Sequence, residues 1–224
     1  MRYFPINLNI RGKRAVIIGG GSVAERKCLS LIQAGAQVTV IAPDLVNGLR
    51  DLHAQGSIVH LAREYKAGDL ADAFLVFAAT DDHATNRAAA AEAKAAGIPA
   101  NIADAPEISD FTSPSVIARG ELLITVSTGG KFPLLSRKIR EELEGLFGPE
   151  YGAALELLGA VREKLLTEKG NNAYNRKLLC ELVGHNLPVL VKNRSTVEID
   201  HLLLKLFGPG FTLAELGVKG KDTE

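Results

Sequence analysis

A run of three glycines near the start of the chain, within VIIGGGSVAERK, has the spacing of a dinucleotide-binding turn. Gly19, Gly21 and Ala24 fit the pattern G-x-G-x-x-G/A, in which the backbone approaches a pyrophosphate and a small third residue lets a helix pack closely on the preceding strand. Ser22 and Glu25 form an S-x-x-E capping box, which predicts that a helix begins beside the glycines. Because a helix N-terminus with free N–H groups binds anions, the stretch predicts a dinucleotide-binding site. The alternative is that these glycines serve only a tight turn.

The residue expected to bind the adenosine ribose is displaced from its usual position. An acid commonly ends the second strand of such a fold, but here Ile41, Ala42 and Pro43 precede Asp44. Asp44 is still within reach of the ribose, and no arginine stands beside it to bind a 2′-phosphate. This favours NAD over NADP.

An aspartate follows a later apolar run, in the sequence NIADAP. Asp104 closes a predicted strand, and ligands of open α/β sheets lie at the carboxyl ends of the strands. An acid in that place is a candidate to act on a substrate beside a bound nicotinamide. A turn or helix-capping aspartate before Ala105 and Pro106 has equal weight on these grounds.

A basic cluster lies between residues 111 and 140, where five lysines and arginines accompany a single acid. Within it, the turn TGGK that ends at Lys131 again places glycines before a helical pattern, which predicts a second anion site. The alternative is a solvated helix face, because Arg137, Lys138 and Arg140 are followed by glutamates at helical spacing.

Other catalytic sets are absent from the sequence. No tyrosine is followed four residues later by lysine, so the Tyr-x-x-x-Lys pair of short-chain dehydrogenases is missing. The histidines have no metal-ligand spacing, so no metal site is predicted and each is expected to be a surface or packing residue. They are His53, His60, His83, His185 and His201.

The elements that must position these residues alternate between short apolar runs and helical patterns up to about residue 103. Such alternation predicts right-handed parallel crossovers and a Rossmann-type doubly wound α/β sheet. After it, a predicted antiparallel hairpin around Arg119-Gly120 and an amphipathic helix form a small α+β unit, and the remaining chain has helical patterns only. We therefore predict an NAD-binding domain at 1–112, a small α+β segment at 113–147 and a helical domain at 148–224. The hairpin has alternating apolar positions with little chain of its own to cover them, including Val116, Leu122, Ile124 and Val126. An uncovered apolar face commonly packs against another subunit, so 113–147 is a candidate dimerisation segment.

Composition limits the partners of the chain. The 26 basic and 26 acidic residues balance, so no overall charge favours nucleic acid or an acidic membrane. The two cysteines form no C-x-x-C pair, and the start of the chain does not have the pattern of a signal peptide. No apolar run approaches the roughly 18 residues of a membrane span. We expect a cytoplasmic protein with no nucleic-acid or membrane partner.

Four motifs in this order and spacing, VIIGGGSVAERK, AATDD, NIADAP and ITVSTGGKFPLLSRKIREELE, resemble the precorrin-2 dehydrogenase family, which includes the N-terminal module of siroheme synthase. The resemblance covers about residues 1–147. It implies a homodimer that oxidises the tetrapyrrole precorrin-2 to sirohydrochlorin with NAD, a step towards siroheme.

The resemblance also implies roles for individual residues. Asp104 falls on the catalytic aspartate of the family. The cofactor-binding positions are Gly19, Gly20, Gly21, Ser22, Val23, Pro43, Asp44 and Thr80. The substrate-binding positions are Arg119, Ser127, Thr128, Gly129, Gly130 and Lys131, and a basic cluster suits a substrate that bears many carboxylates.

Two other functions stay open. Some relatives also insert iron into sirohydrochlorin, and such an activity would depend on Asp104 and the ring nitrogens of the substrate. A domain of another class would sense NAD without turning it over. That class generally has an acid closing the second strand and no basic Gly-Gly-Lys turn, so the sequence favours the dehydrogenase.

Overall fold

The computed structural model describes residues 2–169 and 173–218; parts of the predicted helical domain at 148–224 therefore lie outside the described residues. The chain divides into two compact units. One comprises Met1–Ser113 with Gly129–Lys131, and the other Pro114–Thr128 with Phe132–Glu224. The second unit contains both the hairpin segment and the helical region, so the predicted division of the chain into three domains stays a prediction.

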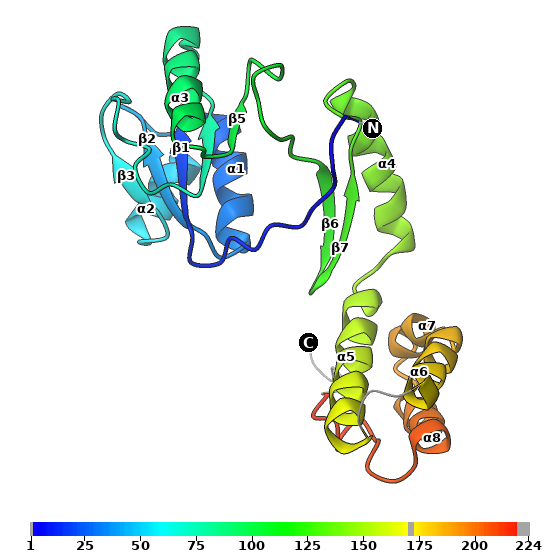
Figure 1. Cartoon of the computed structure of the whole chain (residues 1–224). Helices are drawn as coiled ribbons and strands as arrows, with labels where there is room; N and C mark the ends of the chain where they lie inside the picture. The colour runs from blue at the N-terminus through cyan, green and yellow to red at the C-terminus, as the bar shows by residue number, and fades with distance from the viewer. Residues whose placement is uncertain (1, 170–172, 219–224) are drawn as a thin grey trace. The chain divides into compact units, whose positions relative to one another are not determined.

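The first unit is built on a five-stranded parallel sheet (Figure 1). The strands have the order β3-β2-β1-β4-β5, so the chain reverses its direction of progress between β1 and β4. This is the arrangement expected of a Rossmann-type sheet and confirms the predicted fold class. The strands are β1 (Arg14–Ile18), β2 (Gln37–Ile41), β3 (Val59–Leu61), β4 (Leu75–Ala78) and β5 (Ala100–Ile102).

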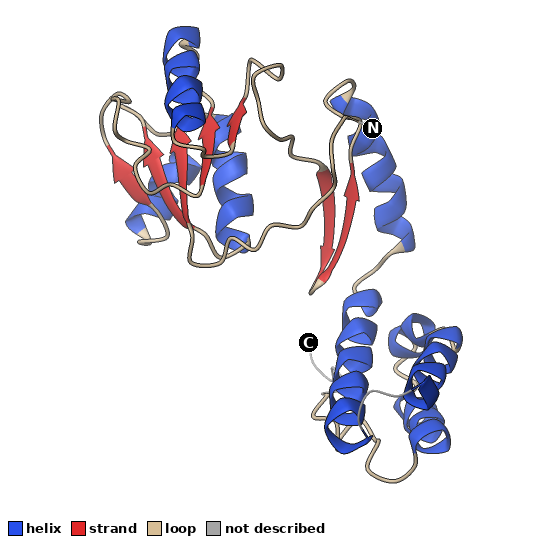
Figure 2. Cartoon of the chain, in the orientation of Figure 1, coloured by secondary structure: helices blue, strands red, loops and turns tan. Residues whose placement is uncertain are grey.

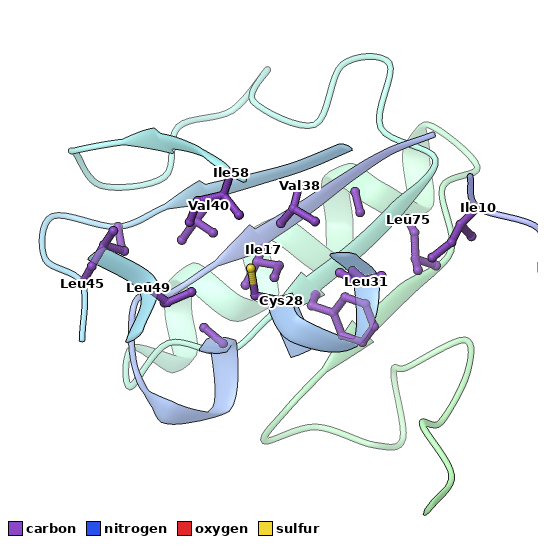
Figure 3. Packing of buried hydrophobic residues seen from close by; sticks show 14 residues of the cluster. Ile10, Ile17, Cys28, Leu31, Val38, Val40, Leu45, Leu49, Ile58 and Leu75 are labelled. Atoms are coloured by element: carbon purple, nitrogen blue, oxygen red, sulfur yellow. The ribbon is translucent and has the colours of Figure 1, made fainter. Parts of the chain in front are cut away.

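Three helices cover the two faces of this sheet: α1 (Ser22–Gln33), α2 (Asn47–Ala54) and α3 (His83–Ala95). Successive residues of a strand point to opposite faces, so Ile17 joins a core with α1 and α2, whereas Val16 joins a core with α3. Figure 3 shows the first of these cores, with Cys28 of α1 packed among residues of the sheet. Burial on both faces explains the continuous apolar runs of the central strands β1 and β4.

The predicted alternation of strands and helices is wrong at one connection. Residues 62–74, between β3 and β4, form turns and no helix. Their conformation is held by Glu92 of α3, whose carboxylate accepts hydrogen bonds from the Tyr65 hydroxyl and from the N–H groups of Gly68 and Leu70. A carboxylate on a neighbouring element thus takes the place of the internal hydrogen bonds of a helix.

The second unit begins with an antiparallel hairpin of β6 (Ser115–Arg119) and β7 (Leu122–Val126), as predicted. It continues with α4 (Pro133–Leu146), and α4 packs on the hairpin, where Ser115 and Ser136 are hydrogen-bonded at 3.3 Å. Only helices and loops follow in the described part of the chain, as Figure 2 shows. These helices are α5 (Glu150–Lys169), α6 (Ala173–Gly184), α7 (Leu187–Lys192) and α8 (Thr196–Phe207). They share one apolar core, and α7 is a short helix that periodicity did not predict.

The hairpin has one face against α4 and one exposed apolar face. The sequence predicts that Val116, Leu122, Ile124 and Val126 share an uncovered surface. This is wrong, because the register pairs Val116 with Thr125 and so places Val116 on the opposite face from the other three. The exposed face instead carries Val116 and Leu123, which are 46% and 49% exposed.

Candidate functional site

The glycine turn lies between β1 and α1, at the carboxyl edge of the sheet. The predicted capping box is wrong by one residue: Gly21 is the N-cap of α1, and no side chain caps the helix. Ser22 is therefore the first helical residue. Glu25 lies one residue too far along the helix to complete a capping box, and its carboxylate occupies the space that a side chain on Gly48 of α2 would need. The N-terminus of α1 is left open to an anion from outside.

The three glycines have different physical roles. A Cβ atom on Gly19 would lie 2.3 Å from the carbonyl oxygen of Ala79, and one on Gly20 would lie 1.9 Å from that of Asp44. These two positions must be glycine because backbone from two other loops occupies the space of a side chain. A Cβ on Gly21 would have no atom of the protein within 4 Å. Only Gly21 therefore faces space that a ligand can occupy.

The other predicted cofactor-binding residues surround this turn. Pro43 and Asp44 are exposed in the loop that follows β2, and this loop is attached to the turn by a 2.9 Å hydrogen bond from the N–H of Val46 to the oxygen of Gly20. Ser22 and Val23 are exposed in the first turn of α1. The structure thus brings these residues to one rim, beside the point between β1 and β4 where doubly wound sheets bind their ligands.

Thr80 follows β4 and is joined to a buried asparagine that the sequence did not single out. Asn86 of α3 is fully buried, and its Oδ1 accepts from both the N–H and the Oγ1 of Thr80, at 3.2 and 2.9 Å. Its Nδ2 donates to the carbonyl oxygen of Thr80 at 3.0 Å and to Asp104 Oδ1 at 2.8 Å. Because donors surround one end of the amide and acceptors the other, its orientation is fixed.

Asp104 lies two residues beyond β5, next to the end of β4, and receives a second partner from α3. His83 is the first residue of that helix, and its Nδ1 contacts Asp104 Oδ2. The hydrogen bond from His83 lowers the pKa of the Asp104 carboxyl; burial opposes this shift, and the hydrogen bond from Asn86 adds to it. Asp104 is therefore an ionised carboxylate at neutral pH, with a quarter of its side chain exposed.

The structure adds a contact to one of the histidines, which were predicted to be surface or packing residues. His53 and His60 are packing residues, as predicted: their rings meet edge to face at 5.5 Å, and His60 Nε2 bonds the oxygen of Ala42. His83 is a surface residue, with 78% of its side chain exposed, and it also contacts Asp104. One feature of the sequence could have indicated it, because a residue at the start of a helix after β4 lies beside the end of the neighbouring strand.

The predicted substrate-binding residues differ in their contacts with the rest of the protein. Arg119, at the end of β6, donates from Nε to the carbonyl oxygen of Phe147 at 2.9 Å and pairs with Glu144 at 3.6 Å, so its guanidinium is held within the second unit. Lys131 is exposed and has no ion pair among the described residues. The glycines before it, Gly129 and Gly130, have φ of 63° and 79°, a conformation that favours glycine.

Ser127 and Thr128 precede these glycines, and Thr128 Oγ1 accepts a 3.4 Å hydrogen bond from the N–H of Phe132 just after the turn. The basic residues of α4 are the solvated helix face that was the alternative, since Arg137, Lys138 and Arg140 each pair with a glutamate four residues on. Their charge is largely neutralised on the helix itself.

Two absences concern only the described part of the chain. It contains no group of three or more histidine, cysteine, aspartate or glutamate side chains that could hold a metal ion. Among its helices none combines the length and the apolar character needed to cross a membrane.

Known proteins match this chain along most of its length. Residues 6–115 match the family model described as "Putative NAD(P)-binding", which supports the predicted NAD cofactor. Siroheme synthase 3 of Aeromonas hydrophila is 40% identical over 184 residues, which are 82% of this chain and 39% of that protein. Siroheme synthase of Nitrosomonas europaea is 37% identical over 205 residues, which are 90% of this chain and 43% of that protein. The chain thus spans about two fifths of the length of these relatives.

A solved structure also matches most of the chain. It is described as "SirC, precorrin-2 dehydrogenase", and the match has a TM-score of 0.72 and 25% identity, covering 91% of this chain and 98% of that one. Taken with the glycine turn and the position of Asp104, these similarities show that the chain belongs to the family formed by precorrin-2 dehydrogenase and the N-terminal part of siroheme synthases.

Proposed function

We propose that this chain oxidises precorrin-2 to sirohydrochlorin with NAD⁺. The observation that carries the proposal is the position of Asp104: an ionised carboxylate, fixed by Asn86 and His83, stands at the carboxyl edge of the sheet. The same edge carries the open glycine turn, separated from Asp104 only by β4. The family membership supports this choice of reaction, since the structural relative is described as a precorrin-2 dehydrogenase.

The residues present fit NAD. When bound, this cofactor supplies a hydride acceptor. Gly21, Ser22 and Val23 would hold its pyrophosphate at the uncapped start of α1, where free N–H groups and the helix dipole favour a negative charge. Pro43 and Asp44 would contact the adenosine half, and the carboxylate of Asp44 favours a ribose hydroxyl over a 2′-phosphate. Thr80 would lie at the edge of the NAD site next to β4.

The substrate offers several carboxylates, which need cationic or N–H partners. Lys131, together with the turn Ser127, Thr128, Gly129 and Gly130 that precedes it, is our candidate, because an exposed lysine ammonium binds carboxylates through charge-assisted hydrogen bonds. Arg119 is assigned a supporting role: it attaches the end of β6 to Glu144 of α4 and to Phe147. Asp104 would stand beside the reacting part of the macrocycle, at the carboxyl edge of the sheet.

We further propose that two copies associate through the exposed hairpin face. Val116 and Leu123 are about half exposed on a sheet of only two strands. A two-stranded sheet with an exposed apolar face is marginal alone and commonly packs against another surface. The cytoplasmic location stays a prediction.

The deciding experiment is to add precorrin-2 and NAD⁺ to the full chain and to follow the ultraviolet absorbance of NADH. We expect NADH and sirohydrochlorin to form in equal amounts, with no reaction when either reactant is omitted. Binding of NAD⁺ with no NADH would instead favour the non-catalytic sensor. Absence of both binding and turnover would reject the proposal together with the cofactor assignment.

A further inference from the structure

We propose that His83 accepts the proton released by the substrate and that Asp104 acts by holding His83 in the tautomer that can do so. This inference rests on the proposed dehydrogenase function. It adds His83 to the reaction and assigns separate roles to His83 and Asp104. The geometry on which it depends lies within the first unit: His83 Nδ1 against Asp104 Oδ2, and Asn86 Nδ2 against Asp104 Oδ1.

The contact between the two side chains fixes the position of the imidazole proton. An ionised carboxylate is an acceptor only, so the nitrogen that contacts Asp104 must carry hydrogen. In the neutral ring the lone pair is then on Nε2, away from Asp104. The side chain of His83 is 78% exposed, so its free nitrogen is accessible. Orientation of a histidine base by a carboxylate is a general catalytic device.

Asp104 itself is poorly suited to take the proton. Both of its oxygens already accept hydrogen bonds, one from a fully buried asparagine that cannot turn. The same hydrogen bonds lower the pKa of Asp104, and a carboxyl with a lowered pKa is a weaker base. Asp104 is instead placed to stand opposite the imidazolium that forms once His83 has accepted the proton.

Three other charged residues lie close to His83 along the chain, and none of them contacts its ring in the described part of the structure. Asp82, the preceding residue, caps α3: its carboxylate accepts from the N–H groups of Ala84 and Thr85 and from the hydroxyl of Thr85. Asp81 precedes it, and Arg87 lies one turn further along the same helix face. Asp104 is the one acidic group that contacts the His83 ring among the described residues.

The proposed step balances in atoms and electrons. One C–H bond of the macrocycle breaks with its electron pair, and this hydride reduces NAD⁺ to NADH. A proton leaves the neighbouring atom of the macrocycle to His83 Nε2, and the electron pair it leaves behind forms the new double bond. His83 then returns the proton to water. The macrocycle is oxidised by two electrons and NAD⁺ is reduced by two.

The test compares His83→Gln with the wild type in single turnover of precorrin-2, where product release does not contribute. Glutamine still donates a hydrogen bond to Asp104 but has no basic nitrogen. We expect the rate to fall about 100-fold, the lower range of the loss for a general base, with NAD⁺ affinity unchanged. The matched control is His201→Gln on α8, which should behave as wild type.

A second variant guards against a merely structural effect. His83→Ala opens space beside Asp104, and added imidazole should restore part of the lost rate in this variant but not in the wild type. The inference is overturned if His83→Gln retains a rate within about twofold of the wild type. It is also overturned if imidazole restores nothing. In each of these cases the wild type still forms NADH, so the proposed dehydrogenase function would stand.

Discussion

The carbonyl oxygen of Asp44 occupies the place where a side chain on Gly20 would begin, at 1.9 Å from the position of its Cβ. The loop after β2 is thereby packed directly on the glycine turn, and Val46 adds a hydrogen bond to the oxygen of Gly20. Adjacent glycines of one motif therefore serve different purposes: Gly20 allows two loops to meet, and Gly21 borders the space assigned to the cofactor.

Replacement of Gly21 by valine should abolish NAD⁺ binding and leave the fold intact. The backbone there has φ of −87° and ψ of −174°, which any residue adopts, and a Cβ would meet no protein atom within 4 Å. The added methyl groups would stand where the pyrophosphate approaches. Calorimetric titration with NAD⁺ and a thermal melt check the two halves of this expectation; unchanged affinity would contradict the assignment of the turn.

Gly20→Ala is the matched comparison. It should lower the stability of the protein, which Gly21→Val is expected to leave unchanged. Its single methyl group would press on backbone that belongs to another loop, so we expect the free energy of unfolding to fall by about 2 kcal/mol, within the range for overpacking. Urea unfolding measures it. A Gly20→Ala protein as stable as the wild type would show that the loop after β2 moves aside easily.

Asp104→Asn should reduce turnover about 100-fold and leave NAD⁺ affinity unchanged. The substitution keeps the shape of the side chain, but its NH₂ group must face either Asn86 Nδ2 or His83 Nδ1, both of which donate. Because His83 and Asp104 are proposed to act as a unit, the double variant with His83→Gln should be about as slow as the slower single variant. Steady-state rates of NADH formation test this. If the losses of the two single variants multiply in the double variant, His83 and Asp104 act independently.

Leu123→Glu should convert a dimer into a monomer. Leu123 is 49% exposed beside Val116 on the hairpin face that α4 does not cover, and a buried unpaired charge would oppose association there. Light scattering at micromolar concentration gives the mass. Val197→Glu, at an 80% exposed position on α8, is the control and should leave the mass unchanged. A wild-type monomer would show that the hairpin face is not an interface between copies.

Glu92→Gln should destabilise the protein in a pH-dependent way. Burial acts to raise the pKa of Glu92, but hydrogen bonds from Tyr65, Gly68 and Leu70 outweigh it, so the net shift is a lowering. A carboxyl whose pKa is lowered by folding stabilises the protein above its ordinary pKa, and this contribution is lost as the pH falls through the folded-state value.

We therefore expect a deficit of about 2 kcal/mol for Glu92→Gln near neutral pH, the scale for donors left without their charged acceptor, and a smaller deficit in acid. Urea unfolding of both proteins at neutral pH and at about pH 3, below the ordinary pKa of glutamate, measures it. Glu163→Gln on the exposed side of α5 is the control. A deficit that grows in acid would contradict the sign of the shift.

The sequence alone determined which segments form strands and helices of the first unit, because continuous apolar runs, helical periodicity and glycine stops are local properties of the chain. It also determined the glycine turn and placed Asp104 at the end of a strand, since both follow from where β1 and β5 end. The predicted capping box was wrong by one residue, because the geometry of the glycine turn, and not Ser22, determines where α1 begins.

Only the tertiary structure decided which side chains contact Asp104. Pairing of Ala78 with Ile102 makes the ends of β4 and β5 neighbours, and α3 begins just after β4, so His83 and Asn86 meet a residue about twenty positions further along the chain. The hairpin shows the same limit, because alternation along a strand defines two faces but not which one α4 covers. Periodicity records how one segment is buried, whereas a site formed by several segments depends on the order of the strands in the sheet.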